Sequence, residues 1–284
     1  MPVRFPAALD DGPRTPGGST CPGNGEISPV RAIRSPESAR RRNAASPQEV
    51  ATDATSDSVR TGGLMKIGII GAGNIGGNLT RRLTSLGHQV SVANSRGPET
   101  LTDLAEETGA TPVTVAEAAR GAEIVVVTVP FKNVPDLPAG LFDGAAEGFA
   151  VIDTGNYYPK HRDGRIAGVE DEGLTESRWT ERHLGHPVVK AFNGTYAADI
   201  IDRPRPAGHP ERIALPVAGD HEEAKKAVRA LIDELGFDTV DAGGLDESWR
   251  QQPDTPVYGL RGGVEAVTRA LAEASPVRTD AFRG

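Results

Sequence analysis

The sequence has almost no cysteine. Its single cysteine, Cys21, lies near the N-terminus, so residues 65–284 have none for a disulfide, a thiol nucleophile or a cysteine-ligated metal site. Paired His and Glu residues around His183 and His186 have no further His or Cys cluster beside them, and we expect no metal site there. This composition fits a reducing compartment, and we expect a cytoplasmic protein.

Long apolar runs and clustered basic residues are also scarce. No stretch approaches the roughly 18 apolar residues of a membrane span, and mean hydropathy is −0.35. Lys and Arg total 31 against 39 Asp and Glu, giving a formal net charge of −8. Because nucleic acids and anionic membranes bind clustered cations, we expect neither as a partner.

Residues 1–64 differ in composition from the rest of the sequence. They contain 8 Pro, 7 Gly and 7 Ser, with Phe5 as the only aromatic residue and no Lys. Such a segment buries too little apolar surface to offset its ordering entropy, so we expect it to be disordered. Met65 directly precedes the first strand-like run, and we expect it to be the biological start.

A glycine-rich motif follows this start. The β-branched run at 66–70 precedes Gly71, Ala72, Gly73, Asn74, Ile75 and Gly76, and a helical pattern that ends at Gly87 comes next. This strand, turn and helix order is typical of dinucleotide binding. Gly71 permits the tight turn, Gly73 lets the backbone approach a pyrophosphate, and Gly76 allows close packing of the helix.

The end of the second strand indicates which dinucleotide binds. The strand at 88–93 leads into Asn94, Ser95 and Arg96, about 20 residues beyond the glycines. An NAD site usually has Asp or Glu here for the ribose 2′-hydroxyl, whereas Arg accommodates a 2′-phosphate. The sequence therefore predicts NADP.

Strand and helix patterns continue to alternate. The patterns predict helices over 98–108, 116–119, 176–184 and 222–235, strands over 111–113, 123–129, 149–153, 187–192, 213–217 and 238–241, and a polar loop over 160–173. We expect an α/β fold with a Rossmann-type, doubly wound parallel sheet. Residues 65–193 would form the NADP-binding domain, and residues 194–284 a small C-terminal α/β extension packed on the same body.

Several of these segments together resemble a known family, the NADPH-dependent reductases of the deazaflavin coenzyme F420, and the related nucleotide-binding domain of six-transmembrane metalloreductases. The segments that carry the resemblance are Gly71–Gly76, Asn94–Arg96, Val129–Pro130, Lys190–Asn193, Pro216–Asp220 and Asp241–Gly243. The resemblance implies a homodimer that transfers hydride from NADPH to a flavin-like acceptor.

The resemblance also implies roles for individual residues. Ala72, Gly73, Asn74 and Ile75 would contact the pyrophosphate, Ser95 and Arg96 the 2′-phosphate, and Val129 the nicotinamide side. Pro130 follows Val129 at the carboxyl end of a central strand, and we place both against the nicotinamide ribose. Asn193 and Ala197 would lie near the nicotinamide carboxamide. The loop from Tyr157 to Gly185 departs from the family pattern, which affects the acceptor and not the cofactor.

The catalytic groups are left open by the sequence. Asn193, Lys190 and Tyr157 are our candidates, with Tyr158 and His186 as further proton donors. Lys190 is either a desolvated acid or a paired structural lysine, and the two tyrosines either line a pocket or cap the core. A deazaflavin acceptor needs no general acid, because stacked rings suffice for hydride transfer.

Three functions remain in view. The first is hydride transfer between NADPH and a flavin or deazaflavin, with coenzyme F420 among the candidate acceptors. The second is NADP-dependent reduction of a small carbonyl or imine, or oxidation of a hydroxy acid, and the third is NADP sensing without catalysis.

Overall fold

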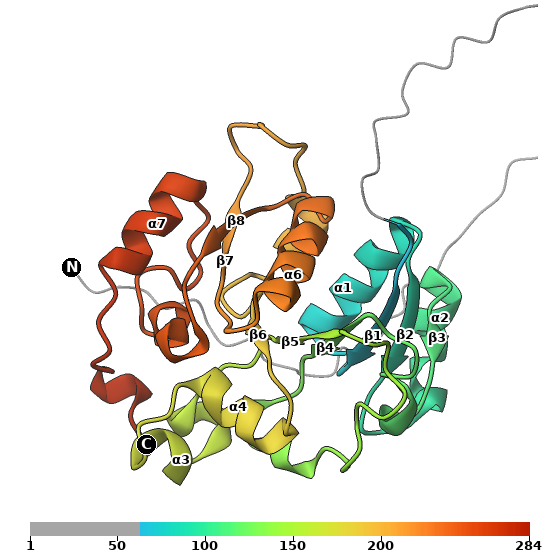
Figure 1. Ribbon diagram of the computed structural model, residues 1–284, viewed down its shortest axis with the longest axis horizontal. Helices are drawn as coiled ribbons and strands as arrows, with labels where there is room; N and C mark the ends of the chain where they lie inside the picture. Colours follow the sequence, from blue (N-terminus) through green and yellow to red (C-terminus); the bar gives the residue numbers. More distant parts are fainter. Residues whose placement is uncertain (1–62) are drawn as a thin grey trace, which may run out of the picture. The chain divides into compact units, whose positions relative to one another are not determined.

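The computed structural model describes residues 63–284, and its central feature is a six-stranded parallel sheet (Figure 1). The strand order is β3-β2-β1-β4-β5-β6. The strands are β1 (Lys66–Ile70), β2 (Gln89–Ala93), β3 (Thr111–Pro112), β4 (Ile124–Val127), β5 (Ala150–Asp153) and β6 (Val189–Lys190). This order is that of the doubly wound dinucleotide fold, so the predicted fold class is confirmed. The segment expected to be disordered, residues 1–64, lies outside the described residues except for its last two.

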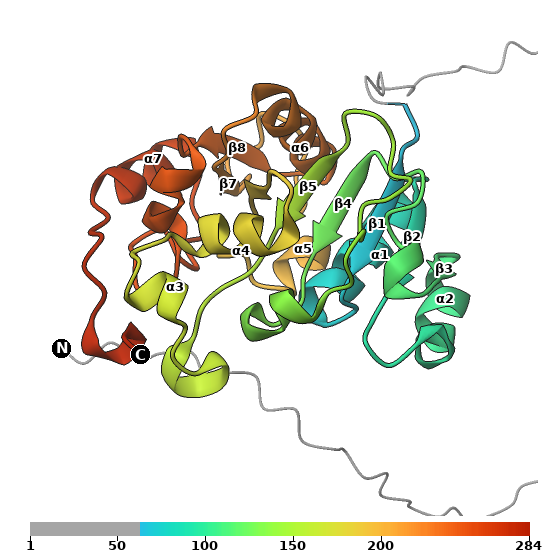
Figure 2. The same ribbon diagram turned by 60° about the horizontal axis from the view of Figure 1, so that its bottom comes forward.

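The sheet reverses its order between β1 and β4, which are direct neighbours. Ile67 pairs with Ile124 and Ile70 with Val127, and β5 continues beside β4 (Figure 2). The carboxyl ends of these strands therefore meet at one edge, and doubly wound folds bind their ligand outside this edge, where the strand order reverses.

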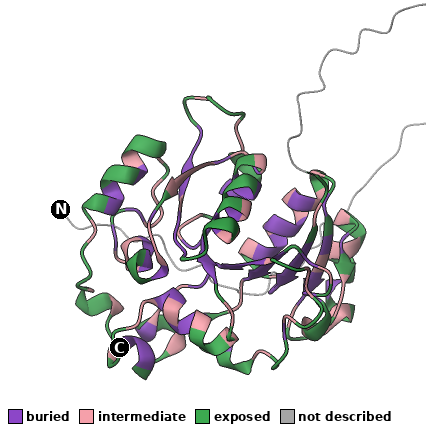
Figure 3. Ribbon diagram, viewed as in Figure 1, coloured by how far each residue is buried: buried purple, intermediate pink, exposed green. Residues whose placement is uncertain are grey.

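Apolar side chains alternate between the two faces of the sheet. Ile67 and Ile69 join one core cluster with Leu79 and Leu83 of α1 (Asn74–Ser85) and with α6 (Glu222–Glu234). Ile70 faces the opposite cluster, beside Ala118, Leu141 and Leu245. Figure 3 shows the resulting pattern of buried strands and helices exposed on their outer sides. Burial on both faces explains why β4 reads as an unbroken apolar run.

A second, two-stranded sheet adjoins the first. It consists of β7 (Ala214–Val217) and β8 (Asp238–Asp241), which pair in parallel. Lys190 of β6 exchanges backbone hydrogen bonds with Ala218 just beyond β7, at 2.8 and 3.1 Å, so the two sheets are joined at this point.

The remaining helical segments lie in the connections. They are η1 (Pro98–Leu101), α2 (Thr102–Thr108), η2 (Val115–Glu117), η3 (Phe131–Asp136), η4 (Pro159–Asp163), α3 (Ala167–Glu170), α4 (Glu176–Leu184), α5 (Asp199–Asp202), η5 (Leu245–Gln251), α7 (Val264–Ala272) and η6 (Asp280–Phe282). Helix α4 has the predicted bounds because the Thr175 side chain caps its start and Gly185, at φ 62°, ends it.

Some predicted segments were wrong. The expected polar loop at 160–173 contains most of η4 and all of α3, because Asp163 accepts a hydrogen bond from the backbone of Tyr158 at 2.8 Å and closes the chain into a turn. The strand expected over 187–192 shrinks to Val189–Lys190, because Phe192 adopts a left-handed backbone with φ 62°. The helix at 116–119 is the short η2, and the first turn of the helix at 98–108 is the separate η1.

Candidate cofactor and hydride-transfer site

The glycine loop between β1 and α1 is shaped for close approach. Gly71 has φ 109°, and a Cβ there would lie 2.3 Å from the Thr128 carbonyl oxygen, while a Cβ on Gly76 would lie 1.9 Å from the Gly71 oxygen. These two glycines are therefore required by the fold itself. At Gly73 a Cβ would meet no atom within 4 Å, so the backbone there is open to an approaching group.

Helix α1 begins at this open position. Gly73 is its N-cap and supplies no side-chain hydrogen bond to the first turn. A helix N-terminus without a side-chain cap presents backbone N–H groups and the positive end of the helix dipole to an anion. The loop from Gly71 to Gly76 thus has the geometry and the electrostatics for a pyrophosphate.

The loop after β2 exposes two polar side chains. Asn94 Oδ1 accepts a hydrogen bond from the Arg96 backbone N–H at 2.9 Å, and its Nδ2 donates to Thr100 Oγ1 at 2.9 Å. This Asx turn leaves Ser95 and Arg96 exposed. Within residues 63–284 the Arg96 guanidinium has no ion-pair partner, so a charged fork stands free where a 2′-phosphate would lie.

The loop after β4 lies at the same edge of the sheet as the glycine loop. Val129 is half-buried and Pro130 exposed, and Phe131 behind them is buried against Trp179 with ring centroids 4.4 Å apart. The buried ring fixes the direction in which the loop leaves the sheet.

Three amide side chains connect the ends of β5, β6 and η5. Asn193 Nδ2 donates to Asn156 Oδ1 at 3.1 Å and to the Gln251 carbonyl at 2.7 Å, and Gln251 Nε2 donates to Asn193 Oδ1 at 3.1 Å. Asn156 Nδ2 in turn donates to the Asn193 carbonyl at 2.8 Å. The left-handed backbone of Phe192 turns Asn193 into this network, and such strain is retained where the surroundings determine the geometry.

Lys190 lies in a buried cluster of charges. Its Nζ is 3.4 Å from Glu176 Oε2 and 4.0 Å from Asp153 Oδ2, and it donates to the Gly155 carbonyl at 3.0 Å. Arg278 reaches Glu176 from the C-terminal segment at 3.0 Å. Burial raises the pKa of Glu176, although the charges of Lys190 and Arg278 oppose that shift. Of the two readings of Lys190, the contacts are those of the paired lysine.

The two tyrosines after β5 have different surroundings. Tyr157 is fully buried, its hydroxyl accepts a hydrogen bond from the Ile166 N–H at 3.0 Å, and its ring packs against Phe131. Tyr158 is half-buried, and its hydroxyl contacts that of Tyr258. Burial raises the pKa of both Tyr158 and Tyr258 well above the usual range. Tyr157 thus caps the core, whereas Tyr158 faces another polar group.

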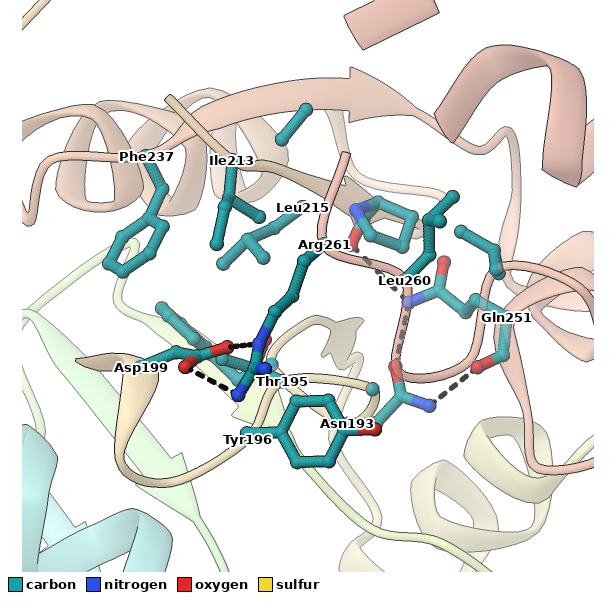
Figure 4. A pocket seen from close by; sticks show the side chains of 15 residues that line it. Asn193, Thr195, Tyr196, Asp199, Ile213, Leu215, Phe237, Gln251, Leu260 and Arg261 are labelled. Atoms are coloured by element: carbon teal, nitrogen blue, oxygen red, sulfur yellow. Dashed lines mark hydrogen bonds and ion pairs between the residues drawn. The ribbon is translucent and has the colours of Figure 1, made fainter. Parts of the chain in front are cut away.

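A narrow pocket lies beside Asn193, between the end of β6 and the second sheet (Figure 4). Ile213, Leu215 and Phe237 form an apolar wall, and Arg261 extends past it to a bidentate ion pair with Asp199 at 2.7 and 2.9 Å. The Arg261 guanidinium also lies 4.5 Å from the centre of the Tyr196 ring. The next residue, Ala197, accepts a hydrogen bond from Asn78 of α1 at 2.8 Å, which ties this segment to the glycine-loop helix.

The histidines do not form a metal site. His183 Nδ1 contacts the Trp179 carbonyl and His186 Nδ1 the Pro187 carbonyl, both at 2.8 Å. Across residues 63–284 no cluster of three or more His, Cys, Asp or Glu side chains has a metal-binding arrangement.

Comparison with known proteins bears on this geometry. Residues 66–157 match the model of the family described as NADP oxidoreductase, coenzyme F420-dependent. The matched residues include the glycine loop, Arg96 and the β4 loop. The cofactor predicted from Arg96, NADP, agrees with the description of this family.

Individual relatives cover different shares of the chain. The Escherichia coli protein YjhV is 47% identical over 60 residues, which are 21% of this chain and 44% of that protein; the chain thus spans less than half of this curated relative's length. A hypothetical protein from Sinorhizobium meliloti has 29% identity and a TM-score of 0.57, over 69% of this chain and 94% of its own. An Arthrobacter protein assigned as an F420-dependent NADP-reductase has 24% identity and a TM-score of 0.53, over 64% and 86%, and shows likeness of fold.

The structure brings together most of the residues singled out in the sequence. The glycine loop, Val129 and Asn193 follow β1, β4 and β6 at one sheet edge, and Ala197 is tied to α1. Lys190 and Tyr157 lie behind that edge. Asn156, Gln251 and Tyr258 were missed, because their partners are 37 to 100 residues away. In the described part of the chain, no helix has the length and apolar character needed to cross a bilayer.

Proposed function

We propose that the protein transfers hydride between NADPH and a flavin or deazaflavin, with coenzyme F420 as the first acceptor to test. In this proposal Ala72, Gly73, Asn74 and Ile75 contact the pyrophosphate, and Ser95 and Arg96 bind the 2′-phosphate. The remaining cofactor contacts would come from Gly71, Gly76, Asn94, Val129, Pro130, Asn193 and Ala197.

The observation that carries the acceptor class is that, among residues 63–284, no unpaired charged acid lies at the ends of β5 and β6, beside the proposed nicotinamide position. Lys190 is fully buried and engaged by Glu176, Asp153 and the Gly155 carbonyl. The side chains at these strand ends are neutral amides, those of the half-buried Asn156 and the buried Asn193. Hydride transfer between stacked rings depends on the positions of the rings more than on a charged proton donor. This edge of the sheet can supply such positioning.

The described residues have separate tasks in such a reaction. NADPH supplies the hydride when it is bound. The glycine loop holds the phosphates, and the hydrogen bonds between Asn156, Asn193 and Gln251 keep the nicotinamide end of the site rigid. Asn78 holds Ala197 against α1, so the two ends of the cofactor site keep a fixed separation. Because a shift of about 1 Å in such reactions costs much of the rate, this rigidity favours transfer.

Reduction of a small carbonyl or imine has less support. It requires a proton donor within hydrogen-bond reach of the substrate. Lys190 is occupied by carboxylates, the Tyr157 hydroxyl by Ile166, and His186 Nδ1 by its neighbouring carbonyl. Of the candidate donors this leaves the Tyr158 hydroxyl, a neutral phenol in contact with Tyr258.

Stopped-flow mixing under anaerobic conditions tests the proposal. The protein is mixed with NADPH and with oxidised deazaflavin, FMN, or a panel of carbonyls and imines in separate reactions. We expect rapid NADPH oxidation with the deazaflavin or FMN. Turnover with carbonyls or imines only would replace the proposal with the second function, and tight NADPH binding without any turnover would replace it with a sensor.

A further inference from the structure

Two tyrosines lie next to residues of the proposed hydride site. Tyr158 is two residues beyond Asn156, and Tyr258 lies against Gly194, where an added Cβ would be 3.6 Å from the Tyr258 ring. The backbone N–H of Gly259 donates to the Gly194 carbonyl at 3.1 Å, which fixes Tyr258 next to the residue after Asn193. The two hydroxyls meet although they are 100 residues apart in sequence.

The two tyrosine hydroxyls carry one more hydrogen than the hydrogen bond between them uses. Each phenol carries one O–H, and one of these suffices for the hydrogen bond between the two oxygens. Among residues 63–284 neither hydroxyl has a second hydrogen-bond partner, and both side chains are half-buried. One O–H of the pair therefore remains available for another acceptor.

The protonation state suits a neutral donor. Burial raises the pKa of both phenols, and the carboxylate of Glu176 acts on each in the same direction. The Arg162 guanidinium, 5.1 Å from the centre of the Tyr158 ring, opposes the shift without reversing it. Both tyrosines thus keep their protons through the neutral range.

We propose that the Tyr158–Tyr258 pair donates a hydrogen bond to the acceptor, which must then carry a carbonyl oxygen or ring nitrogen conjugated to the ring atom that receives hydride. This inference rests on the proposed function. A C–H bond of the dihydronicotinamide breaks with its electron pair, and a new bond to hydrogen forms on the acceptor, a C–H bond in a deazaflavin and an N–H bond in FMN. The nicotinamide is oxidised, and the acceptor gains two electrons and negative charge at the heteroatom. The pair's free O–H stabilises this charge, and the heteroatom takes its proton from solvent.

A purely structural pair would behave differently. In that case the hydroxyls would only pin the loop after β5 to the segment after η5, and their loss would lower stability without a selective effect on turnover. Tyr157 provides a matched control, because its hydroxyl is also hydrogen-bonded but belongs to the core cluster of Phe131 and Trp179.

The experiment compares Tyr158→Phe, Tyr258→Phe, the double variant and Tyr157→Phe in the full chain. With NADPH and oxidised deazaflavin or FMN, we expect kcat to fall about 100-fold in each single variant at the pair, the range for a lost donor to developing charge. The double variant should lose little more, because the two hydroxyls act as one unit. For the variants at the pair, the Kd for NADPH and the Tm should stay near the wild-type values, whereas Tyr157→Phe, which loses a hydrogen bond inside the core, should lower the Tm.

A second readout does not depend on turnover. In the complex with NADP⁺, a hydrogen bond to the ring heteroatom should shift the absorption band of bound deazaflavin or FMN, and either variant at the pair should abolish the shift. A wild-type enzyme that turns over while the Phe variants keep its kcat and its spectrum overturns this inference alone. A wild-type protein with neither turnover nor a spectral shift overturns the proposed function with it.

Discussion

Asn193 and Asn156 bind each other by two hydrogen bonds across the ends of β6 and β5. Asn156 Nδ2 donates to the Asn193 carbonyl at 2.8 Å, and Asn193 Nδ2 donates to Asn156 Oδ1 at 3.1 Å. The pair is anchored from behind by Gln251. Because the donors and acceptors satisfy each other, this part of the proposed site is preorganised before any ligand binds.

The first prediction concerns this network. Asn193→Ala removes both donated hydrogen bonds, including the one to the buried Gln251 carbonyl, and leaves Gln251 Nε2 with only its longer contacts to the Lys190 and Pro216 carbonyls. We expect the free energy of unfolding to fall by about 1–3 kcal/mol, the cost of unpaired buried polar groups, together with a lower kcat. Chemical denaturation and NADPH oxidation measure the two effects. The control is Asn133→Ala in η3, and equal behaviour of the two variants would contradict the assignment.

The second prediction concerns cofactor choice at Arg96. Arg96→Ala should weaken NADPH binding by about 1.5–3 kcal/mol, the range for a hydrogen bond to a charged group, and leave NADH binding nearly unchanged. Fluorescence titration with both cofactors checks this result. Arg120→Ala, an exposed arginine away from the β2 loop, is the control. Equal losses of NADPH and NADH affinity in Arg96→Ala would contradict the assignment of Arg96 to the 2′-phosphate.

The third prediction separates two glycines of one motif. Gly73→Ala places its methyl group in open space, so the fold should survive, but the methyl group would occupy the path of the pyrophosphate. We expect a Tm close to wild type and NADPH binding at least about 10-fold weaker, equivalent to about 1.4 kcal/mol. Gly76→Ala should instead lower the Tm, because its Cβ would lie 1.9 Å from the Gly71 oxygen. The idea fails if Gly73→Ala binds NADPH normally.

The fourth prediction concerns pH and the charges around Lys190. Lys190→Met leaves Glu176 and Asp153 without their buried cation, and we expect a loss of about 3–5 kcal/mol near neutral pH. Burial already raises the folded-state pKa of Glu176, and removing Lys190 raises it further. The folded state then binds a proton more tightly than the unfolded state, so stability falls as the pH rises above the ordinary Glu value and recovers as the pH falls.

Denaturation at several pH values tests this sign. The deficit of Lys190→Met relative to wild type should be smaller at pH 5 than at pH 8. Lys225→Met is the matched control, since Lys225 is also buried but its partners Glu222 and Asp241 are largely exposed. A deficit in Lys190→Met that stays constant over this range would show that Glu176 does not take up the proton.

Local signals in the sequence predicted the fold and the cofactor end of the site. The glycine turn, the Arg96 loop and helix α4 each depend on residues within one turn or one cap, such as Thr175 and Gly185. Local signals did not predict the hydrogen bonds at the acceptor end of the site. The partners of Asn193 are Asn156 and Gln251, 37 and 58 residues distant, and no periodicity records such pairings.

The role of Lys190 was undecided for the same reason. The sequence pattern around a lysine within an apolar strand is the same whether the lysine is unpaired or neutralised by carboxylates. Only the fold brings Glu176 and Arg278 together with it, the latter from a segment 102 residues beyond Glu176.

The junction at β6 has a consequence for how the chain folds. Lys190 pairs with Asp153 of β5 on one side and with Ala218 on the other. Until the segment that contains Ala218 has folded, one edge of this two-residue strand is therefore unpaired. A chain that has been synthesised only as far as Asn193 exposes the unpaired backbone groups of an edge strand, which template aggregation. The β6 edge of the nucleotide-binding sheet therefore stays unpaired until Ala218 reaches it, and contacts between segments distant in sequence form slowly.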